Sequence, residues 1–201
     1  MFHIVSGNLE CKLNEYKINQ SNSDDLIIEY RGLNMNSRLL NKIILMVFVF
    51  LPFSASAAIS VGDSVPSFKA RSIDGSNNIS VNDYRGKVVL IDFWASWCPP
   101  CLKSFPKYDD LRREIGTADF EIIAINVDEN TEDAKKFLSK HPVGFPIVKD
   151  PKGVLPGVFG VKAMPTSYLI DKNGVVKYAH TAFKEGDIEK LKVEIEKLIA
   201  Q

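Results

Sequence analysis

The strongest constraint on the fold of this chain is a short stretch in which an apolar strand leads into a pair of cysteines. The run Val88 to Trp94 is rich in β-branched and aromatic residues, which is typical of a buried strand. After three further residues comes Cys98-Pro99-Pro100-Cys101. Two prolines suit the first turn of a helix, where a missing backbone N–H costs no hydrogen bond. The sequence therefore predicts a helix that begins at Pro99, with Cys98 at its N-cap.

This arrangement predicts different chemical roles for the two thiols. At a helix N-cap the sulfur of Cys98 faces unpaired backbone N–H groups and the positive end of the helix dipole, which favours the thiolate. Cys101 lies one turn along the helix, within reach of Cys98 and expected to be more buried. We predict that Cys98 attacks a partner and that Cys101 then resolves the mixed disulfide. The two sulfurs form a redox pair by themselves, so no cofactor and no metal is expected.

Three other uses of the pair are considered. A zinc site needs four ligands, but the remaining cysteine is Cys11 and the histidines His3, His141 and His180 show no ligand spacing. A purely structural disulfide across two residues closes a very small loop and stabilises little by the loop-entropy argument. Copper binding stays open, because soft thiolates select Cu(I).

Composition places the chain among ordinary globular proteins. It has 201 residues, of which 45% are hydrophobic, with 25 basic and 25 acidic side chains. That length leaves room for one domain of medium size. The balanced charge gives no basic excess, so nucleic acid is not an expected partner.

The first 34 residues have a different character from the rest of the chain. They are polar and weakly patterned, with Asn- and Ser-rich stretches, and they precede an internal methionine, Met35. We expect that translation begins at Met35 and that residues 1–34 are an over-called, disordered extension. Cys11 is then absent from the mature protein.

Residues 35–57 have the pattern of a secretory signal peptide. Arg38 and Lys42 supply the positive start, and residues 43–53 form an apolar stretch of 11 residues. Ala55-Ser56-Ala57 offers the small residues that a signal peptidase reads. The apolar stretch falls short of the roughly 20 residues of a membrane span, although an uncleaved anchor facing the periplasm stays an alternative.

Export changes the interpretation of the cysteines. Exported proteins normally spend cysteines on structural disulfides, and a domain covering residues 58–201 is large enough to build a core without them. A single pair in such a domain favours a working redox centre in the periplasm.

The pattern beyond residue 58 alternates between strands and helices. We predict strands at 67–72, 78–81, 88–94, 120–127, 146–149, 166–170 and 175–178, and helices at 99–115, 131–141 and 185–200. Strand, helix, strand, helix, hairpin and helix in this order indicate an α/β fold. We expect a central mixed sheet flanked by helices, with an N-terminal hairpin extension.

Residues 59–200 resemble the thioredoxin-like fold, and specifically the exported thiol-disulfide oxidoreductases of the TlpA/ResA type, which are grouped with the AhpC/TSA and redoxin domains. Three separated features carry the resemblance. They are the stretch Leu90 to Cys101, the helix proline Pro106 eight residues beyond Cys98, and Ala163-Met164-Pro165-Thr166, which matches the family's cis-proline segment.

The resemblance implies a client-binding surface around the sulfurs. A cis bond at Met164-Pro165 is expected to present the backbone of Met164 to an extended client strand. Trp97 is expected to be a partly exposed lid beside Cys98, and Pro99 and Pro100 to belong to the same surface.

Asp92 is an acid inside the apolar strand, where burial raises the pKa of a carboxyl group. Thioredoxins carry an acid at the matching place, where it exchanges protons with the resolving thiol. The resemblance therefore implies that Asp92 is the general base for Cys101. The lysine that accompanies this acid in thioredoxins is replaced here by Ala124.

The expected activity is that of an exported reductase that donates electrons to oxidised cysteines of client proteins, with cytochrome c maturation and copper-site assembly as candidate settings. An upstream membrane thiol reductant is then an expected partner, and contact with the membrane requires an uncleaved signal segment. A disulfide oxidase or isomerase, and a non-enzymatic copper carrier, are the alternatives. A peroxidase is disfavoured, because Ile91 and Ala95 occupy the positions of the peroxiredoxin proline and threonine.

Overall fold

The computed structural model describes residues 11–17, 29–35 and 58–201. The chain divides into two units, residues 1–55 and 56–201, and each is described by itself. In the first unit β1 (Cys11–Lys17) and β2 (Glu29–Met35) pair antiparallel. These strands differ from the disorder expected for residues 1–34. Apolar residues alternate with polar ones at the start of β1, a short strand pattern that the surrounding Asn- and Ser-rich stretches obscure. Apart from Met35, the expected signal segment lies outside the described residues.

The second unit is built on a five-stranded sheet with the order β7-β6-β5-β8-β9. Its strands are β5 (Val88–Trp94), β6 (Phe120–Asn126), β7 (Ile147–Lys149), β8 (Thr166–Ile170) and β9 (Val176–Thr181). β5, β6 and β7 run parallel, whereas β8 and β9 pair antiparallel with their neighbours. The expected mixed sheet is thereby confirmed. β5 lies at its centre, and all seven of its residues are buried.

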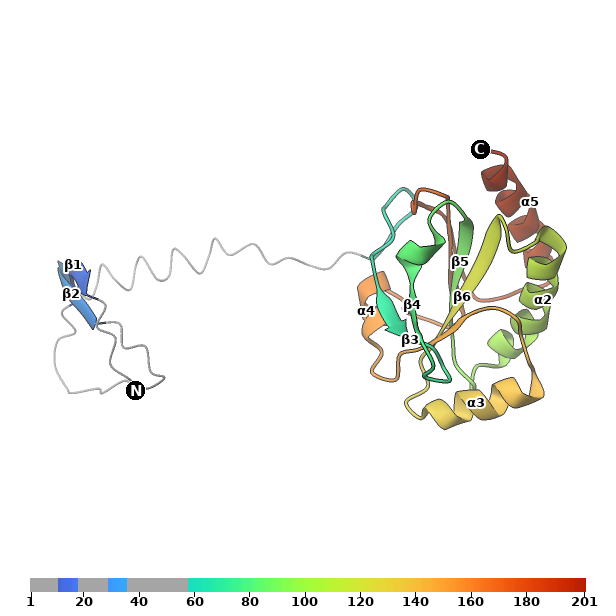
Figure 1. Ribbon diagram of the computed structural model, residues 1–201, viewed down its shortest axis with the longest axis horizontal. Coiled ribbons are helices and arrows are strands. Elements are labelled where there is room, and N and C mark those ends of the chain that lie inside the picture. The colour runs from blue at the N-terminus through green and yellow to red at the C-terminus, as the bar shows by residue number, and fades with distance from the viewer. Residues whose placement is uncertain (1–10, 18–28, 36–57) are drawn as a thin grey trace. The chain divides into compact units, whose positions relative to one another are not determined.

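Helices cover both faces of this sheet (Figure 1). α2 (Pro99–Ile115), α3 (Thr131–Lys140) and α5 (Asp187–Ile199) contribute side chains to the core on one face. The other face packs against the short α4 (Val154–Phe159) and a small hairpin of β3 (Lys69–Arg71) and β4 (Asn78–Ser80). The hairpin continues into a 3-10 turn, η1 (Val81–Tyr84).

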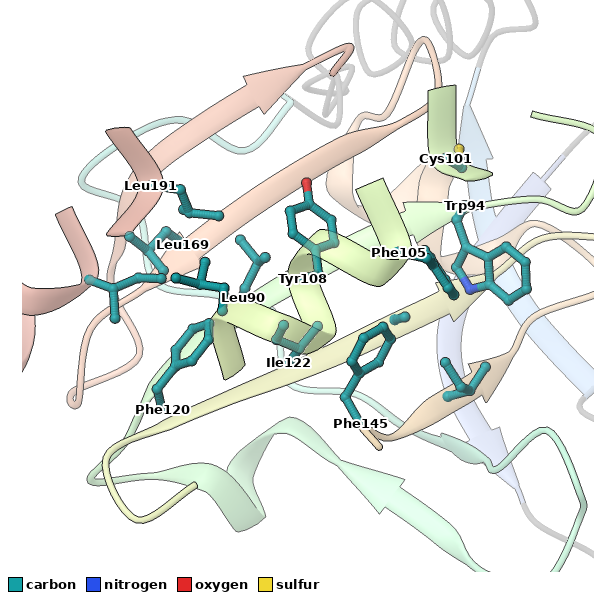
Figure 2. Close-up of a cluster of buried hydrophobic side chains, with 14 of the residues drawn as sticks. Leu90, Trp94, Cys101, Phe105, Tyr108, Phe120, Ile122, Phe145, Leu169 and Leu191 are labelled. Atoms are coloured by element: carbon teal, nitrogen blue, oxygen red, sulfur yellow. The ribbon is translucent and has the colours of Figure 1, made fainter. Parts of the chain in front are cut away.

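The core is split by the sheet into two clusters of buried side chains, because successive residues of a strand point to opposite faces. Val88, Leu90 and Trp94 of β5 join the cluster under α2 and α5, and Val89, Ile91 and Phe93 join the other. Figure 2 shows the first cluster as a row of side chains, with Trp94 and Cys101 near one end, Leu169 and Leu191 near the other, and Tyr108 between them. The active-site helix is thus anchored directly on the central strand.

Two elements of the second unit were not expected from the sequence. η1 follows the β3–β4 hairpin, and α4 lies in a stretch that contains Pro156 and Gly157. Neither residue is a helix former, and the preceding Asp150 to Gly153 reads as a turn. In the structure both oxygens of the Asp150 carboxylate accept backbone N–H groups of α4, from Val154 at 3.2 Å and Leu155 at 2.7 Å. This side-chain cap stabilises a helix that propensity alone does not favour.

Candidate active site

The paired cysteines lie at the start of α2, as the sequence predicts. Cys98 is the N-cap residue, and Pro99 and Pro100 occupy the first two helical positions. Cys98 and Cys101 are joined as a disulfide, with their Cα atoms 5.3 Å apart. The sulfur of Cys98 accepts a hydrogen bond from the backbone N–H of Cys101 at 3.3 Å. The helix terminus therefore offers the Cys98 sulfur the N–H donor that favours a thiolate.

The two cysteines differ slightly in exposure. Cys98 keeps 3% of its surface exposed, whereas Cys101 is completely buried. Next to Cys98, the side chain of Trp97 is 67% exposed, and Leu102 on the following turn is also exposed. Both cysteines belong to the apolar cluster, and Cys98 is the one that keeps exposed surface, so a partner reaches the pair from the side of Cys98. Trp97 thus has the exposure expected of it, while Trp94 and Phe93 are core residues.

The loop that leads into the helix is fixed by an acid that sequence reasoning did not single out. The carboxylate of Asp128 accepts hydrogen bonds from the backbone N–H and the hydroxyl of Ser96, at distances between 3.0 and 3.2 Å. The side-chain amide of Asn126 also donates to Asp128, at 2.8 Å. Asn126 ends β6, and both residues are buried. A polar residue that ends a continuous apolar strand, with an acid two residues later, is the signal that could have identified them.

The peptide bond between Met164 and Pro165 is cis. Pro165 is buried, and its carbonyl accepts the backbone N–H of Ala182 at 2.8 Å. Met164 is half-buried and packs against the cluster that contains both cysteines. Within the described part of the chain, the backbone N–H and carbonyl of Met164 make no hydrogen bond. These groups are available to a partner backbone.

Asp92 is fully buried on β5. It alternates with Leu90 and Trp94, so its side chain lies on the face of the sheet that α2 covers, the face of the cluster containing Cys101. Its Oδ1 accepts a hydrogen bond from the hydroxyl of Ser167 at 2.6 Å, whereas its Oδ2 is buried and has no partner among the described residues. Burial raises the pKa of Asp92 to about 7, and the bond from Ser167 opposes that shift. A carboxyl group with this pKa can both accept and release a proton near neutral pH.

Ala124 is the residue directly opposite Asp92 in the register of β5 and β6. Ala124 is buried, so the side chain beside the acid in this register is a methyl group. Ser167 and Tyr108, which contact the carboxyl group or each other, were not expected from the sequence. They lie 75 and 16 residues from Asp92, and no periodic pattern connects them.

Comparison with known proteins agrees with this geometry. Residues 61–179 match the AhpC/TSA family. The thiol-disulfide oxidoreductase ResA of Geobacillus thermodenitrificans is 37% identical over 125 residues, which cover 62% of this chain and 71% of the relative.

Two solved structures show the same fold. A thiol:disulfide interchange protein, DsbE, from Chlorobium tepidum superposes with a TM-score of 0.67 and 40% identity, covering 71% of this chain and 99% of that one. The exposed lipoprotein thioredoxin Etrx1 from Streptococcus pneumoniae gives a TM-score of 0.53 and 31% identity, covering 64% and 99%. The chain belongs to the AhpC/TSA family and is a thioredoxin-like thiol-disulfide oxidoreductase of the TlpA/ResA type.

Proposed function

We propose that this oxidoreductase works outside the cytoplasm as a reductase of disulfides in client proteins. The observation that carries the proposal is the unequal placement of the two sulfurs at the start of α2. Cys98 caps the helix beside exposed Trp97 and keeps a small exposed surface, whereas Cys101 has none. A sulfur at an N-terminal N–H group, in the cysteine that keeps exposed surface, suits attack, and a fully buried partner one turn away suits resolution.

The reaction has two exchanges. The Cys98 thiolate attacks one sulfur of the client disulfide, and the other client sulfur leaves as a thiolate. Cys101 then attacks Cys98, the mixed disulfide breaks, and the second client sulfur leaves. The client gains two electrons, and the protein ends with the Cys98–Cys101 disulfide seen in the structure. A thiol reductant must supply two electrons to restore the dithiol, and we assign that role to an upstream membrane partner.

Asp92 serves the second exchange as general base. Its position on the α2 face of β5 and its pKa near neutrality support this role. As Cys101 attacks, its S–H proton passes to the Asp92 carboxylate, so that a thiolate rather than a thiol forms the new bond. Without a base, a buried thiol stays protonated and attacks slowly.

Client binding is assigned to Met164, Pro165, Trp97, Pro99 and Pro100. The free backbone groups of Met164 support pairing with an extended client segment, in the manner of an added strand. The exposed indole of Trp97 and the exposed ring of Pro99 offer apolar contact surface at the same helix terminus.

The extracytoplasmic location rests on the signal-peptide pattern of residues 35–57 and on kinship with an exposed lipoprotein thioredoxin. In the described part of the chain, no helix combines the length and hydropathy of a membrane span. Candidate clients are apocytochromes and copper-site assembly proteins, whose cysteines must be reduced before the haem or metal is attached.

The proposal is tested by measuring how the exported form of this protein reduces a client disulfide. The reduced protein is mixed with a tagged peptide that carries the CxxCH disulfide of an apocytochrome, and free peptide thiols are counted over time. We expect one client disulfide reduced per protein, and none with Cys98→Ser. A reduced protein that leaves the peptide disulfide intact contradicts the proposal, and formation of new disulfides in a reduced peptide by the oxidised protein indicates an oxidase.

A further inference from the structure

Three buried polar groups form a hydrogen-bonded chain within the mostly apolar cluster under α2. Asp92 comes from β5, Ser167 from β8 and Tyr108 from α2. The hydroxyl of Ser167 lies 2.6 Å from Oδ1 of Asp92 and 3.3 Å from the hydroxyl of Tyr108. The exposed fractions of the three residues are 0%, 4% and 2%. A buried hydroxyl destabilises a core unless it is hydrogen-bonded. The bonds between these three side chains are therefore needed to keep them inside the protein.

The number of hydroxyl hydrogens determines which side chain donates each of these two hydrogen bonds. A serine hydroxyl has one hydrogen, and the short bond to the Asp92 carboxylate uses it. Tyr108 must then donate its own hydrogen to Ser167. Burial and the nearby carboxylate of Asp92 both raise the pKa of Tyr108 above its ordinary value, so the phenol keeps that hydrogen. Tyr108 thus donates to Ser167, and Ser167 donates to Oδ1 of Asp92.

The other oxygen, Oδ2 of Asp92, is buried and unpartnered among the described residues. A buried acceptor without a donor is rare in a folded protein and calls for an explanation. Ala124 faces Asp92 from β6 and supplies no donor, whereas α2 covers the same face with Cys101. The thiol of reduced Cys101 is a hydrogen donor that the oxidised pair lacks.

We propose that Ser167 and Tyr108 are positioning residues for the resolving step: their hydroxyls hold Asp92 by Oδ1 and leave Oδ2 to take the proton of Cys101. The inference rests on the proposed role of Asp92 as base. In the step, the S–H bond of Cys101 breaks and an O–H bond forms on Oδ2. The Cys101 sulfur bonds to that of Cys98, and the client sulfur leaves with the electron pair of the mixed disulfide.

At the Tyr108 end, the hydrogen-bonded chain borders a small cavity of about 10 Å³. Its lining includes Tyr108, Ser167, Tyr178, His180, Phe183 and Asp187. A cavity of this volume can hold about one water molecule. The titratable groups that face the chain are Cys101 and Tyr108 from α2, Tyr178 and His180 from β9, and Asp187 from α5. His180 Nε2 lies 2.9 Å from Asp187 Oδ2. Histidine is the residue type that ordinarily changes charge near neutral pH, so His180 has its own control below.

The test is the pH profile of resolution, measured by stopped flow on mixed disulfides with a fluorescent client peptide. In the wild-type protein the rate constant rises with pH as Asp92 ionises. Ser167→Ala removes a hydrogen bond to the charged form, so the midpoint should move upward by about one to two pH units. At neutral pH the resolution rate should fall several-fold or more, and capture by Cys98 should keep its rate.

Companion variants separate positioning from damage to the fold. Tyr108→Phe should shift the midpoint in the same direction by less, and Ser167→Thr, which keeps the hydroxyl, should restore the wild-type midpoint. Tyr168→Phe is the matched control. Tyr168 is the neighbouring residue of β8, and its hydroxyl donates to the carbonyl of Phe159 on the opposite face of the sheet, so its loss should leave the midpoint in place. His180→Gln should also leave the midpoint unchanged. That result would show that the pH profile follows the ionisation of Asp92 and not that of His180.

The outcomes distinguish this inference from the proposed function. If Ser167→Ala keeps the wild-type midpoint while Asp92→Asn slows resolution, the positioning role is wrong and the reductase mechanism stands. If the wild-type protein reduces no client, the proposed function fails first. If Ser167→Ala does not fold, Tyr108→Phe provides the test. A Tyr108→Phe midpoint equal to that of the wild-type protein would overturn the positioning role of the two hydroxyls.

Discussion

Asp92 lies directly opposite Ala124 across the parallel pair of β5 and β6. The nearest position on the neighbouring strand thus supplies a methyl group in place of a cation, and the hydroxyl of Ser167 is the single hydrogen-bond donor to this carboxyl group among the described residues. Burial therefore dominates, and it raises the pKa of Asp92 from 3.8 to about 7. Both the stability and the chemistry of the protein should depend on this acid.

Asp92→Asn should stabilise the oxidised protein at neutral pH. The unfolded chain loses the Asp92 proton near pH 3.8, whereas the folded protein keeps it up to about pH 7. Between these values the folded state binds more protons, so the wild-type protein loses stability as the pH rises. The free energy of unfolding should shift in favour of the variant by up to about 4 kcal/mol across this window. Urea melts of both oxidised proteins between about pH 4.5 and pH 8 measure the difference.

The same variant should slow resolution and leave capture by Cys98 unchanged, because asparagine cannot accept the proton of Cys101. Stopped-flow kinetics separate the two exchanges. A variant that resolves mixed disulfides at the wild-type rate and is also less stable would identify Asp92 as a purely structural residue.

Substitution of the cysteines should give opposite phenotypes. Cys98→Ser should abolish reduction of insulin-type disulfides, because attack requires the sulfur at the helix terminus. Cys101→Ser should accumulate mixed disulfides with clients, because attack survives and resolution does not. Non-reducing gels with mass spectrometry of the trapped species check both. Trapping by Cys98→Ser instead of Cys101→Ser would reverse the assigned roles.

Asp128→Ala should loosen the loop that positions the active-site helix. Buried Asp128 accepts from the N–H and hydroxyl of Ser96 and from Asn126, and these donors lose their partner in the variant. We expect a loss of about 1–3 kcal/mol in the free energy of unfolding and a slower attack by Cys98. Asp133→Ala, an exposed acid in the first turn of α3, is the control and should change neither quantity by much.

The exported protein should lack residues 1–57. The small residues Ala55-Ser56-Ala57 precede the expected cleavage point, so the exported protein should begin at Ala58 or within a residue or two of it. Mass spectrometry of the periplasmic fraction measures the N-terminus. Recovery of an uncleaved chain from membranes would support the anchored alternative.

The sequence predicted the parts of the site that depend on local patterns. The strand Val88–Trp94 and the helix Pro99–Ile115 have the bounds that the apolar run, the two prolines and Gly116 indicate. Cys98 is at the N-cap for the same local reason. The cis bond at Met164-Pro165 agrees with the family resemblance.

The parts that could not be predicted depend on contacts across the sheet. Ser167 reads as one polar residue in an apolar strand, and Tyr108 as one of several apolar positions on the buried face of α2. Only the antiparallel pairing of β5 with β8 sets Asp92 opposite Ser167. Likewise α4 depends on the side-chain cap from Asp150, which local propensity does not reveal.

The equilibrium potential of the Cys98/Cys101 pair tests the reductase proposal most directly. The purified protein is equilibrated with glutathione buffers of graded ratio, and the fraction of oxidised pair is read by thiol alkylation and mass. A reductase is predicted to have a potential near that of thioredoxin, roughly −270 mV. A value near that of the strong oxidants, roughly −120 mV, would contradict the account, because electrons would then flow from clients to this protein.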